Sequence, residues 1–268
     1  MATTTLQIRR LGPVTWVLMD RAAQRNAFNP TMIAELTDIF RTLSQHPDGS
    51  RVAVLAGEGD IFSAGADVDW MRSMGTLGVA ANIADAHLLA DLFQAIRDCP
   101  LPVIARVQGA AMGGGSGLVA ACDLAVAAEG TRFAFSEARL GIVPAVISPF
   151  VLSKVNPGPG RELFLTGETF DAQRAREIGL VSRVVPAAQL DEAVEERVGA
   201  LLAAGPEAQA AIKQLVPLVL AANSPAAMRD YSTRLIAERR ASAEGREGLT
   251  AFLERRRPAW MAGESSGR

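Results

Sequence analysis

A single carboxylate, Glu137, is the best-placed acid or base of this chain. It lies in residues 135–141, downstream of a glycine-rich turn at residues 109–117. That turn follows an apolar strand and opens onto an apolar helix, and the N–H groups at a helix N-terminus carry positive potential. Because glycines leave those N–H groups accessible, the pattern predicts an anion-stabilising hole beside one candidate acid/base.

A second glycine-containing loop, residues 62–67, has the same setting between a strand and a helix, and Asp67 is favourable in the first turn of that helix. Two such loops can each supply one backbone N–H to a common oxygen, which is the arrangement that stabilises a thioester enolate. One glycine-rich turn alone more often reflects tight packing. The pairing of two loops with Glu137 favours catalysis.

A second carboxylate is missing from the glycine helix, where Ser116 and Gly117 stand. One glutamate in an apolar pocket has a raised pKa, which suits a group that both gives and takes a proton. Such a group can move a proton between two carbons of an enolate, or take a proton from water and deliver it to the α-carbon. Proton transfer from water also needs a polar group that holds the water, and the candidates are Ser116 and a carboxylate of the substrate.

Composition limits the classes of partner. Apolar residues make up 49% of the 268 residues and the net charge is −2, which argues against nucleic acid or an anionic membrane surface as a partner. Cys99 and Cys122 make no disulfide framework, and no apolar run approaches the roughly 20 residues of a membrane helix. His46 and His87 lack carboxylate or cysteine company at ligand spacing, so we expect no metal. Residues 1–10 show no apolar signal core, so we expect a cytoplasmic protein.

Strands and helices alternate through the first two thirds of the chain, which predicts an α/β domain. A hairpin is expected at residues 6–9 and 14–19, and a helix that starts at Asn29-Pro30. Further strands are expected at residues 52–56, 103–107, 124–128, 132–135 and 181–185, a helix at 85–96, and late helices from Leu190, Pro206, Pro225 and Arg246. The predicted division is a core at residues 1–190 and a helical C-terminal oligomerisation region at 191–268.

The chain resembles the enoyl-CoA hydratase/isomerase (crotonase) superfamily over nearly its whole length. The matching pieces occur in the family's order and spacing at residues 25–27, 62–67, 108–115, 122–123, 135–137, 140–144, 165–167 and 179–181. The resemblance implies a crotonase-like spiral of ββα units with a helical trimerisation tail, assembled as a homo-trimer or hexamer. It also implies acyl-CoA thioester substrates and no separate cofactor, because CoA is part of the substrate.

The resemblance also assigns roles to individual positions. Ala66 and Gly114 correspond to the two oxyanion N–H donors, and Glu137 to the glutamate that moves the proton at the α-carbon. Ser63, Ala64 and Ala66 would line the adenine and pantetheine path. Phe252 and Arg255 match tail positions that reach the nucleotide end of CoA on a neighbouring subunit, although Arg255 also fits a solvated charge. The remaining binding candidates are Arg25, Asp67, Trp70, Gly113 and Pro144.

Two departures from the family pattern guide the substrate hypothesis. Common hydratases carry a second glutamate at the position of Gly117, and many relatives continue with glycines after Pro144. Residues 145–150 instead resemble those of bacterial 3-methylglutaconyl-CoA hydratases, which favours reversible hydration of such a thioester by Glu137 alone. A Δ3,Δ2-enoyl-CoA isomerase is the alternative, and a non-catalytic acyl-CoA binding protein is a third. A diacid substrate would want a cation, for which Arg72, Arg106 and Arg139 are candidates.

Overall fold

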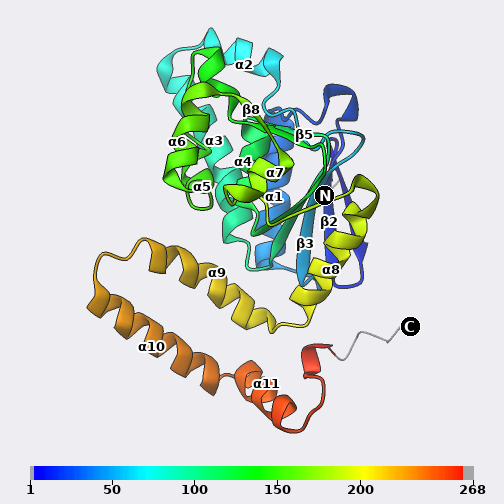
Figure 1. Ribbon diagram of the computed structural model, residues 1–268, viewed down its shortest axis with the longest axis vertical. Helices are drawn as coiled ribbons and strands as arrows, with labels where there is room; N and C mark the ends of the chain where they lie inside the picture. The colour runs from blue at the N-terminus through cyan, green and yellow to red at the C-terminus, as the bar shows by residue number, and fades with distance from the viewer. Residues whose placement is uncertain (1–2, 262–268) are drawn as a thin grey trace. The chain divides into compact units, whose positions relative to one another are not determined.

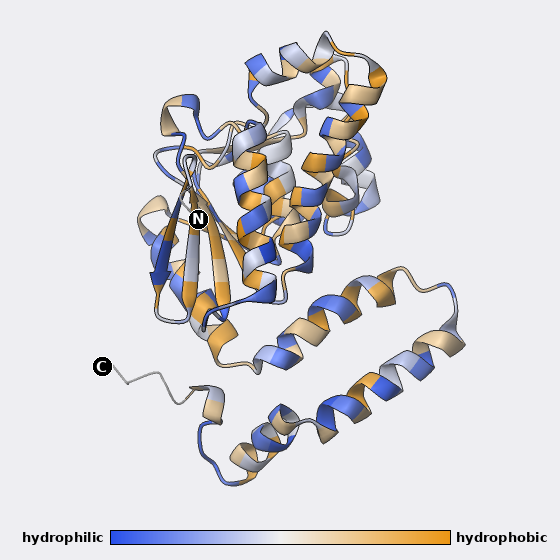
Figure 2. Ribbon diagram, turned by 180° about the vertical axis from the view of Figure 1, so that it is seen from behind, coloured by the Kyte–Doolittle hydropathy of each residue, from blue (hydrophilic) through white to orange (hydrophobic). Residues whose placement is uncertain are grey.

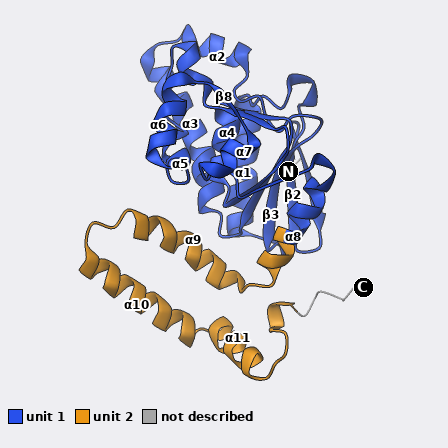
Figure 3. Ribbon diagram, in the orientation of Figure 1, with its two compact units in different colours: residues 1–196 blue, residues 197–268 orange. Residues whose placement is uncertain are grey.

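The computed structural model describes residues 3–261 and divides the chain into two compact units, residues 1–196 and 197–268 (Figure 3). The division falls inside helix α8 (Leu190–Leu202), after Glu196 rather than after residue 190. No helix in this described range is both long and apolar enough to span a bilayer.

The first unit is built on a six-stranded sheet. Its strands, in spatial order, are β1 (Leu6–Leu11), β2 (Val14–Met19), β3 (Val52–Gly57), β4 (Val103–Val107), β6 (Leu124–Ala128) and β9 (Arg183–Val185). Strands β1 and β2 form the predicted antiparallel hairpin, and every other pair is parallel. Parallel strands covered on both faces are continuous apolar runs, which is why the sequence located β3, β4 and β6 well. Figure 2 shows the hydrophobic colouring along these strands and the polar edge strand beside them.

A smaller three-stranded sheet positions the chemistry. It consists of β5 (Ala110–Met112), β7 (Arg132–Ala134) and β8 (Thr169–Asp171). Strand β5 leads directly into α4 (Gly114–Ala121), and β7 leads into the 3₁₀ helix η2 (Ser136–Leu140) that carries Glu137. Because β5 and β7 pair in parallel, their carboxyl ends meet at one edge. The sequence analysis missed β8, which is too short to show a period.

On one side of the large sheet, helix α3 (Val79–Asp98) packs against both α1 (Pro30–Gln45) and α4 (Figure 1). Asn29 caps α1 as predicted, accepting a hydrogen bond from the Met32 N–H. Helix α3 begins before the predicted residue 85, because its first turns are exposed and show no apolar period. The other helices of this unit are η1 (Ala22–Gln24), α2 (Val68–Gly75), α5 (Ser148–Val151), α6 (Pro157–Thr166), α7 (Ala172–Glu177) and η3 (Ala187–Gln189).

The second unit continues from α8 through α9 (Pro206–Leu220), α10 (Pro225–Ala241), α11 (Ala243–Leu253) and η4 (Ala259–Met261). Helices α9 and α10 start at the predicted prolines. Helix α11 starts before the predicted Arg246, because Ser242 caps it by accepting a hydrogen bond from the Gly245 N–H. The Glu244 carboxylate in turn accepts hydrogen bonds from the N–H groups of Glu207 and Ala208 at the start of α9.

Candidate active site

A cavity of about 480 Å³ lies in the first unit. Its wall is made by the loop before α2, by α2 and α3, by the start of α4, by η2 and by residues 140–147. Most of the lining is apolar, which suits an acyl chain. The predicted site residues that line it are Ala64, Ala66, Trp70, Gly113, Gly114, Glu137 and Pro144.

Glu137 is the buried acid of this cavity. Its Oε2 atom is shielded from solvent and makes no hydrogen bond. Burial raises the pKa of the Glu137 carboxyl, and its own backbone N–H opposes this only in part. Gly113, with φ of +49°, leaves room for it: a Cβ added there would lie 3.4 Å from Glu137 Oε1. The arrangement supplies a carboxyl that can hold or release a proton without breaking a structural contact.

The two loops predicted to donate backbone N–H groups lie against each other. A Cβ added to Gly65 would lie 2.5 Å from the Met112 carbonyl oxygen and 3.5 Å from the Gly114 nitrogen. Gly65 has φ of +89°, so glycine is needed here both for the conformation and for the close approach. Within the described chain, the N–H groups of Ala66 and Gly114 make no hydrogen bond, and both residues line the cavity. These two donors are therefore available to a ligand oxygen.

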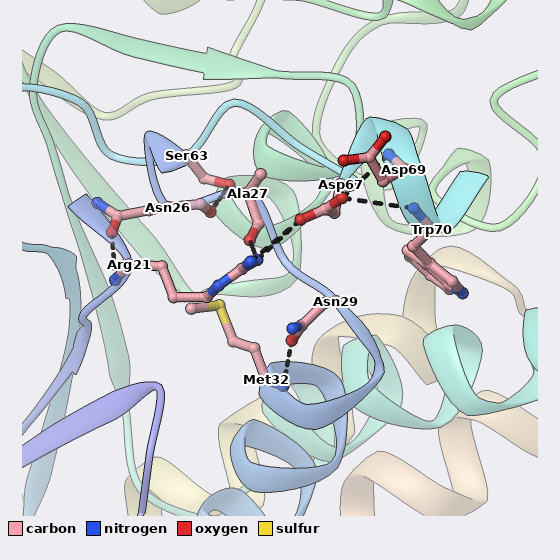
Figure 4. Close-up of polar contacts among 9 residues, drawn as sticks. All are labelled: Arg21, Asn26, Ala27, Asn29, Met32, Ser63, Asp67, Asp69 and Trp70. Atoms are coloured by element: carbon pink, nitrogen blue, oxygen red, sulfur yellow. Dashed lines mark hydrogen bonds and ion pairs between the residues drawn. The ribbon is translucent and has the colours of Figure 1, made fainter. Parts of the chain in front are cut away.

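An ion pair holds the first of these loops (Figure 4). Arg21 pairs with Asp67 at 3.1 Å and also donates to the Ala27 carbonyl. Asp67 Oδ1 accepts from the N–H groups of Asp69 and Trp70, which caps α2. Burial alone would raise the pKa of Asp67, but Arg21 and these N–H groups outweigh it and hold the pKa below its usual range. Asp67 thus fixes the backbone that follows Ala66, and it does not itself line the cavity.

Two other predicted residues also serve the architecture. Ser63 does not line the cavity: it is fully buried, and its hydroxyl donates to the Asn26 carbonyl at 2.9 Å. Arg25 is exposed in the left-handed conformation, with φ of +53°, and its carbonyl accepts from the Ala64 N–H at 2.9 Å. The contribution of Arg25 visible in this unit is therefore its backbone, which ties residues 63–65 to the segment before α1.

The position of the missing carboxylate is filled. A Cβ added to Gly117 would lie 2.4 Å from Ile147 Cγ2 and 3.1 Å from Phe93 Cζ. Ser116, the candidate for holding water, is fully buried and its hydroxyl reaches the carbonyls of Ala111 (2.6 Å) and Ala134 (3.1 Å). Ser116 does not line the cavity, so the expectation that it could hold the water is wrong.

The candidate cations for a diacid substrate lie elsewhere. Arg72 is exposed and pairs with Asp69 at 2.6 Å. Arg106 pairs with Asp191, and Arg139 donates to the Thr166 carbonyl at 3.1 Å. Among the described residues, no lysine, arginine or histidine lines the cavity.

Sequence reasoning missed one functional candidate, Asp85. This residue lines the cavity from α3, and burial raises the pKa of its carboxyl while the nearby Trp70 indole acts in the opposite direction. A signal was available, because Asp85 falls four residues before Leu89 and eight before Phe93 on one helical face. A carboxylate in line with apolar core positions is the pattern from which a site could have been predicted.

Phe252 and Arg255 belong to the second unit. Phe252 is 80% exposed at the end of α11, and Arg255 follows it with φ of +54°. Their predicted contact with the nucleotide end of CoA stays a prediction.

Comparison with known proteins decides the family. Residues 11–263 match the family described as Enoyl-CoA hydratase/isomerase. The chain belongs to the enoyl-CoA hydratase/isomerase family. It is 30% identical over 252 residues to a crotonyl-CoA hydratase of Syntrophomonas wolfei, covering 91% of this chain and 93% of that protein. A hydroxycinnamoyl-CoA hydratase-lyase of Pseudomonas fluorescens is 33% identical over 208 residues, covering 75% of this chain and 74% of that one.

Solved structures agree. An enoyl-CoA hydratase from Shewanella pealeana superposes with a TM-score of 0.92 at 36% identity, covering 96% of each chain. AtuE of Pseudomonas aeruginosa gives a TM-score of 0.91 at 32% identity, covering 96% of this chain and 99% of that one. The α/β fold with its C-terminal helical region is thus the crotonase fold, as the sequence predicted. Because the relatives and the solved structures are named as enoyl-CoA hydratases, this family member is an enzyme.

Proposed function

We propose that this family member catalyses the reversible hydration of a 2-enoyl-CoA thioester. The observation that carries the proposal is the shielded Glu137 carboxyl, whose pKa burial raises, in the same cavity as two unbonded backbone donors. A family site with these parts can form and protonate a thioester enolate. Names of relatives such as the crotonyl-CoA hydratase support the same reaction.

The chemistry assigns one task to each part. The thioester oxygen accepts hydrogen bonds from the Ala66 and Gly114 N–H groups, which stabilise the negative charge that develops as the oxygen of water adds to the β-carbon. Loss of one such donor costs about 3–4 kcal/mol in the barrier. Glu137 takes the proton that the water loses and delivers it to the α-carbon of the enolate, which completes the 3-hydroxyacyl product. Dehydration follows the same steps in reverse, with Glu137 removing the α-proton.

For the substrate we propose a 3-methylglutaconyl-type thioester. Residues 145–150 support it by their resemblance to hydratases of that substrate, and Ile147 from this segment takes the space beside Gly117. Because no cationic side chain of the described residues lines the cavity, the distal carboxylate of such a substrate has to be met by neutral donors or by solvent. The alternative, a Δ3,Δ2-enoyl-CoA isomerase, is favoured by a single observation: the site has Glu137 but no second glutamate at Gly117.

The test compares the wild type with Glu137→Gln on 3-methylglutaconyl-CoA, crotonyl-CoA and 3-hexenoyl-CoA. Hydration adds the mass of water, whereas double-bond migration leaves the mass unchanged. We expect hydration by the wild type and a loss of about 10²–10⁴-fold in kcat for Glu137→Gln, with CoA-ester binding retained. Glu168→Gln, an exposed glutamate outside the cavity, is the matched control. Migration without hydration would establish the isomerase, and binding without turnover would establish the binding protein.

We also propose that the chain assembles as a homo-trimer or hexamer through its second unit. Leu249, Phe252 and Leu253 on α11 are 56%, 80% and 79% exposed in the single chain. Apolar side chains that are this exposed and this close together are typical of an interface. Native mass in solution tests the assembly, and a monomer would contradict it.

A further inference from the structure

The cavity holds two titratable side chains, and Glu137 is only one of them. The other is Asp85, which comes from α3, whereas Glu137 comes from η2. Both residues line one cavity of about 480 Å³, whose wall is otherwise uncharged and mostly apolar within the described part of the chain. Two carboxyls on one acyl pocket suggest a division of labour between an acid and a base.

The reaction needs a second group. A water that adds to the β-carbon must be held and must lose a proton, while Glu137 supplies the proton at the α-carbon. The position on α4 from which a second glutamate would act is Gly117, and Ile147 fills the space in front of it. The neighbouring Ser116 hydroxyl is buried against two carbonyl oxygens. Neither position on α4 can therefore hold the water.

Asp85 has the surroundings of a positioned base. The Trp70 indole Nε1 is shielded from solvent and makes no hydrogen bond, yet it lies near enough to Asp85 to favour the ionised carboxylate. Figure 4 shows the indole extending from α2 away from the Arg21–Asp67 pair, with its nitrogen at the far end. An unpartnered donor beside a carboxylate can fix one carboxylate oxygen and leave the other for water.

The other charged groups near Asp85 are already accounted for. On α2, Asp69 and Arg72 are exposed and pair with each other. On α3 itself, His87 is exposed, and Asp91 pairs with Arg41 at the surface. Glu137 is therefore the one ionisable group that shares the cavity with Asp85 among the described residues.

We propose that Asp85 is a second catalytic residue of the hydration, holding the water and taking its proton, with Trp70 as the positioning residue. The inference rests on the proposed function. As the water oxygen bonds to the β-carbon, one O–H bond breaks and that proton goes to Asp85, while the π electrons of the double bond move into the enolate. Glu137 then gives its proton to the α-carbon. Both carboxyls return to their starting states by exchanging one proton with solvent.

The deciding variant is Asp85→Asn, compared with Asp91→Asn, the same substitution on the exposed side of the same helix. Two rates are measured: hydration of the best enoyl-CoA of the panel, and exchange of the α-protons of butyryl-CoA in D₂O. Exchange needs Glu137 and the two N–H donors but no added water. We expect Asp85→Asn to lower the hydration kcat by about 10²–10³-fold while exchange changes by less than about threefold, because a general base contributes this much. Asp91→Asn should leave both rates unchanged.

The pH profile supplies a test without any variant of Asp85. If Asp85 and Glu137 both act, hydration requires an ionised Asp85 and a protonated Glu137. The value of kcat/KM then falls at acid pH, where Asp85 is protonated, and at alkaline pH, where Glu137 is ionised. With Glu137 alone taking the proton from water, the rate falls only on the acid side. Trp70→Phe removes the indole N–H that favours the ionised Asp85, so the acid limb should move to higher pH.

Each result has a defined meaning. If Asp85→Asn hydrates the substrate at the wild-type rate, the assignment of Asp85 is overturned. The same holds if the variant loses hydration and exchange to the same extent. If Asp85→Asn fails to fold, a wild-type profile that falls only on the acid side overturns it equally. If the wild type hydrates no enoyl-CoA of the panel, the proposed function fails as a whole. Hydration by the wild type that persists in Asp85→Asn refutes only the role of Asp85.

Discussion

The substitution Gly117→Ala tests whether Ile147 occupies the place of the missing carboxylate. The added Cβ would lie 2.4 Å from Ile147 Cγ2 and 3.0 Å from Ile147 Cβ. Carbon atoms rest at about 3.5–4.0 Å, so Ile147 has to move by about 1 Å. Overpacking of this kind costs about 1–3 kcal/mol. Replacing glycine by alanine inside a helix stabilises the folded state by about 1 kcal/mol, which offsets part of this cost.

The net expectation is that Gly117→Ala lowers the free energy of unfolding by up to about 2 kcal/mol, or the melting temperature by up to roughly 8 °C. The assay is urea and thermal denaturation, with Gly158→Ala as the control. An added Cβ at Gly158, on α6, meets no atom within 4 Å. That control should be neutral or slightly stabilising.

A double-variant cycle sharpens the result. Ile147→Ala alone leaves a void and costs about 2–5 kcal/mol. Gly117→Ala then places its methyl group in the space that Ile147 vacates, so the double variant should be more stable than the sum of the two losses by about 0.5–3 kcal/mol. Strict additivity, or a Gly117→Ala protein that is as stable as the Gly158→Ala control, would refute the reasoning about this space.

Two further predictions concern pH. Burial raises the pKa of Glu137, so the folded state disfavours its ionised form; Glu137→Gln should therefore increase the melting temperature at pH 8, and the gain should shrink to nothing as the pH falls below the usual carboxyl range. Equal melting temperatures at pH 8 would contradict this. Asp67 has a pKa lowered from 3.8, so its contribution is present at neutral pH and is lost only as the pH falls below the usual carboxyl range; Asp67→Ala should lower the free energy of unfolding by about 1–2 kcal/mol at pH 7 and by less at about pH 2 in chemical denaturation. A loss that does not depend on pH would show that the Arg21 pair contributes nothing.

The local sequence was enough to identify the two glycine-containing loops and the glutamate that line the cavity. The apolar runs of β3, β4 and β6 are buried on both faces, so their boundaries show in composition alone. Gly65 and Gly113 mark backbone that only glycine adopts easily, and Glu137 follows a strand by a fixed number of residues. Each of these signals is carried by residues close together along the chain.

The tertiary structure decided how the parts are used. Ile147 closes the space at Gly117, Ser116 turns its hydroxyl to the carbonyl oxygens of Ala111 and Ala134, and Asp85 enters the cavity from a helix whose first turns lack a period. These facts depend on contacts between segments distant in sequence, and no local pattern encodes such contacts. The residue types therefore predicted two glycine-containing loops beside a single glutamate, and packing determined which side chains line the cavity between them.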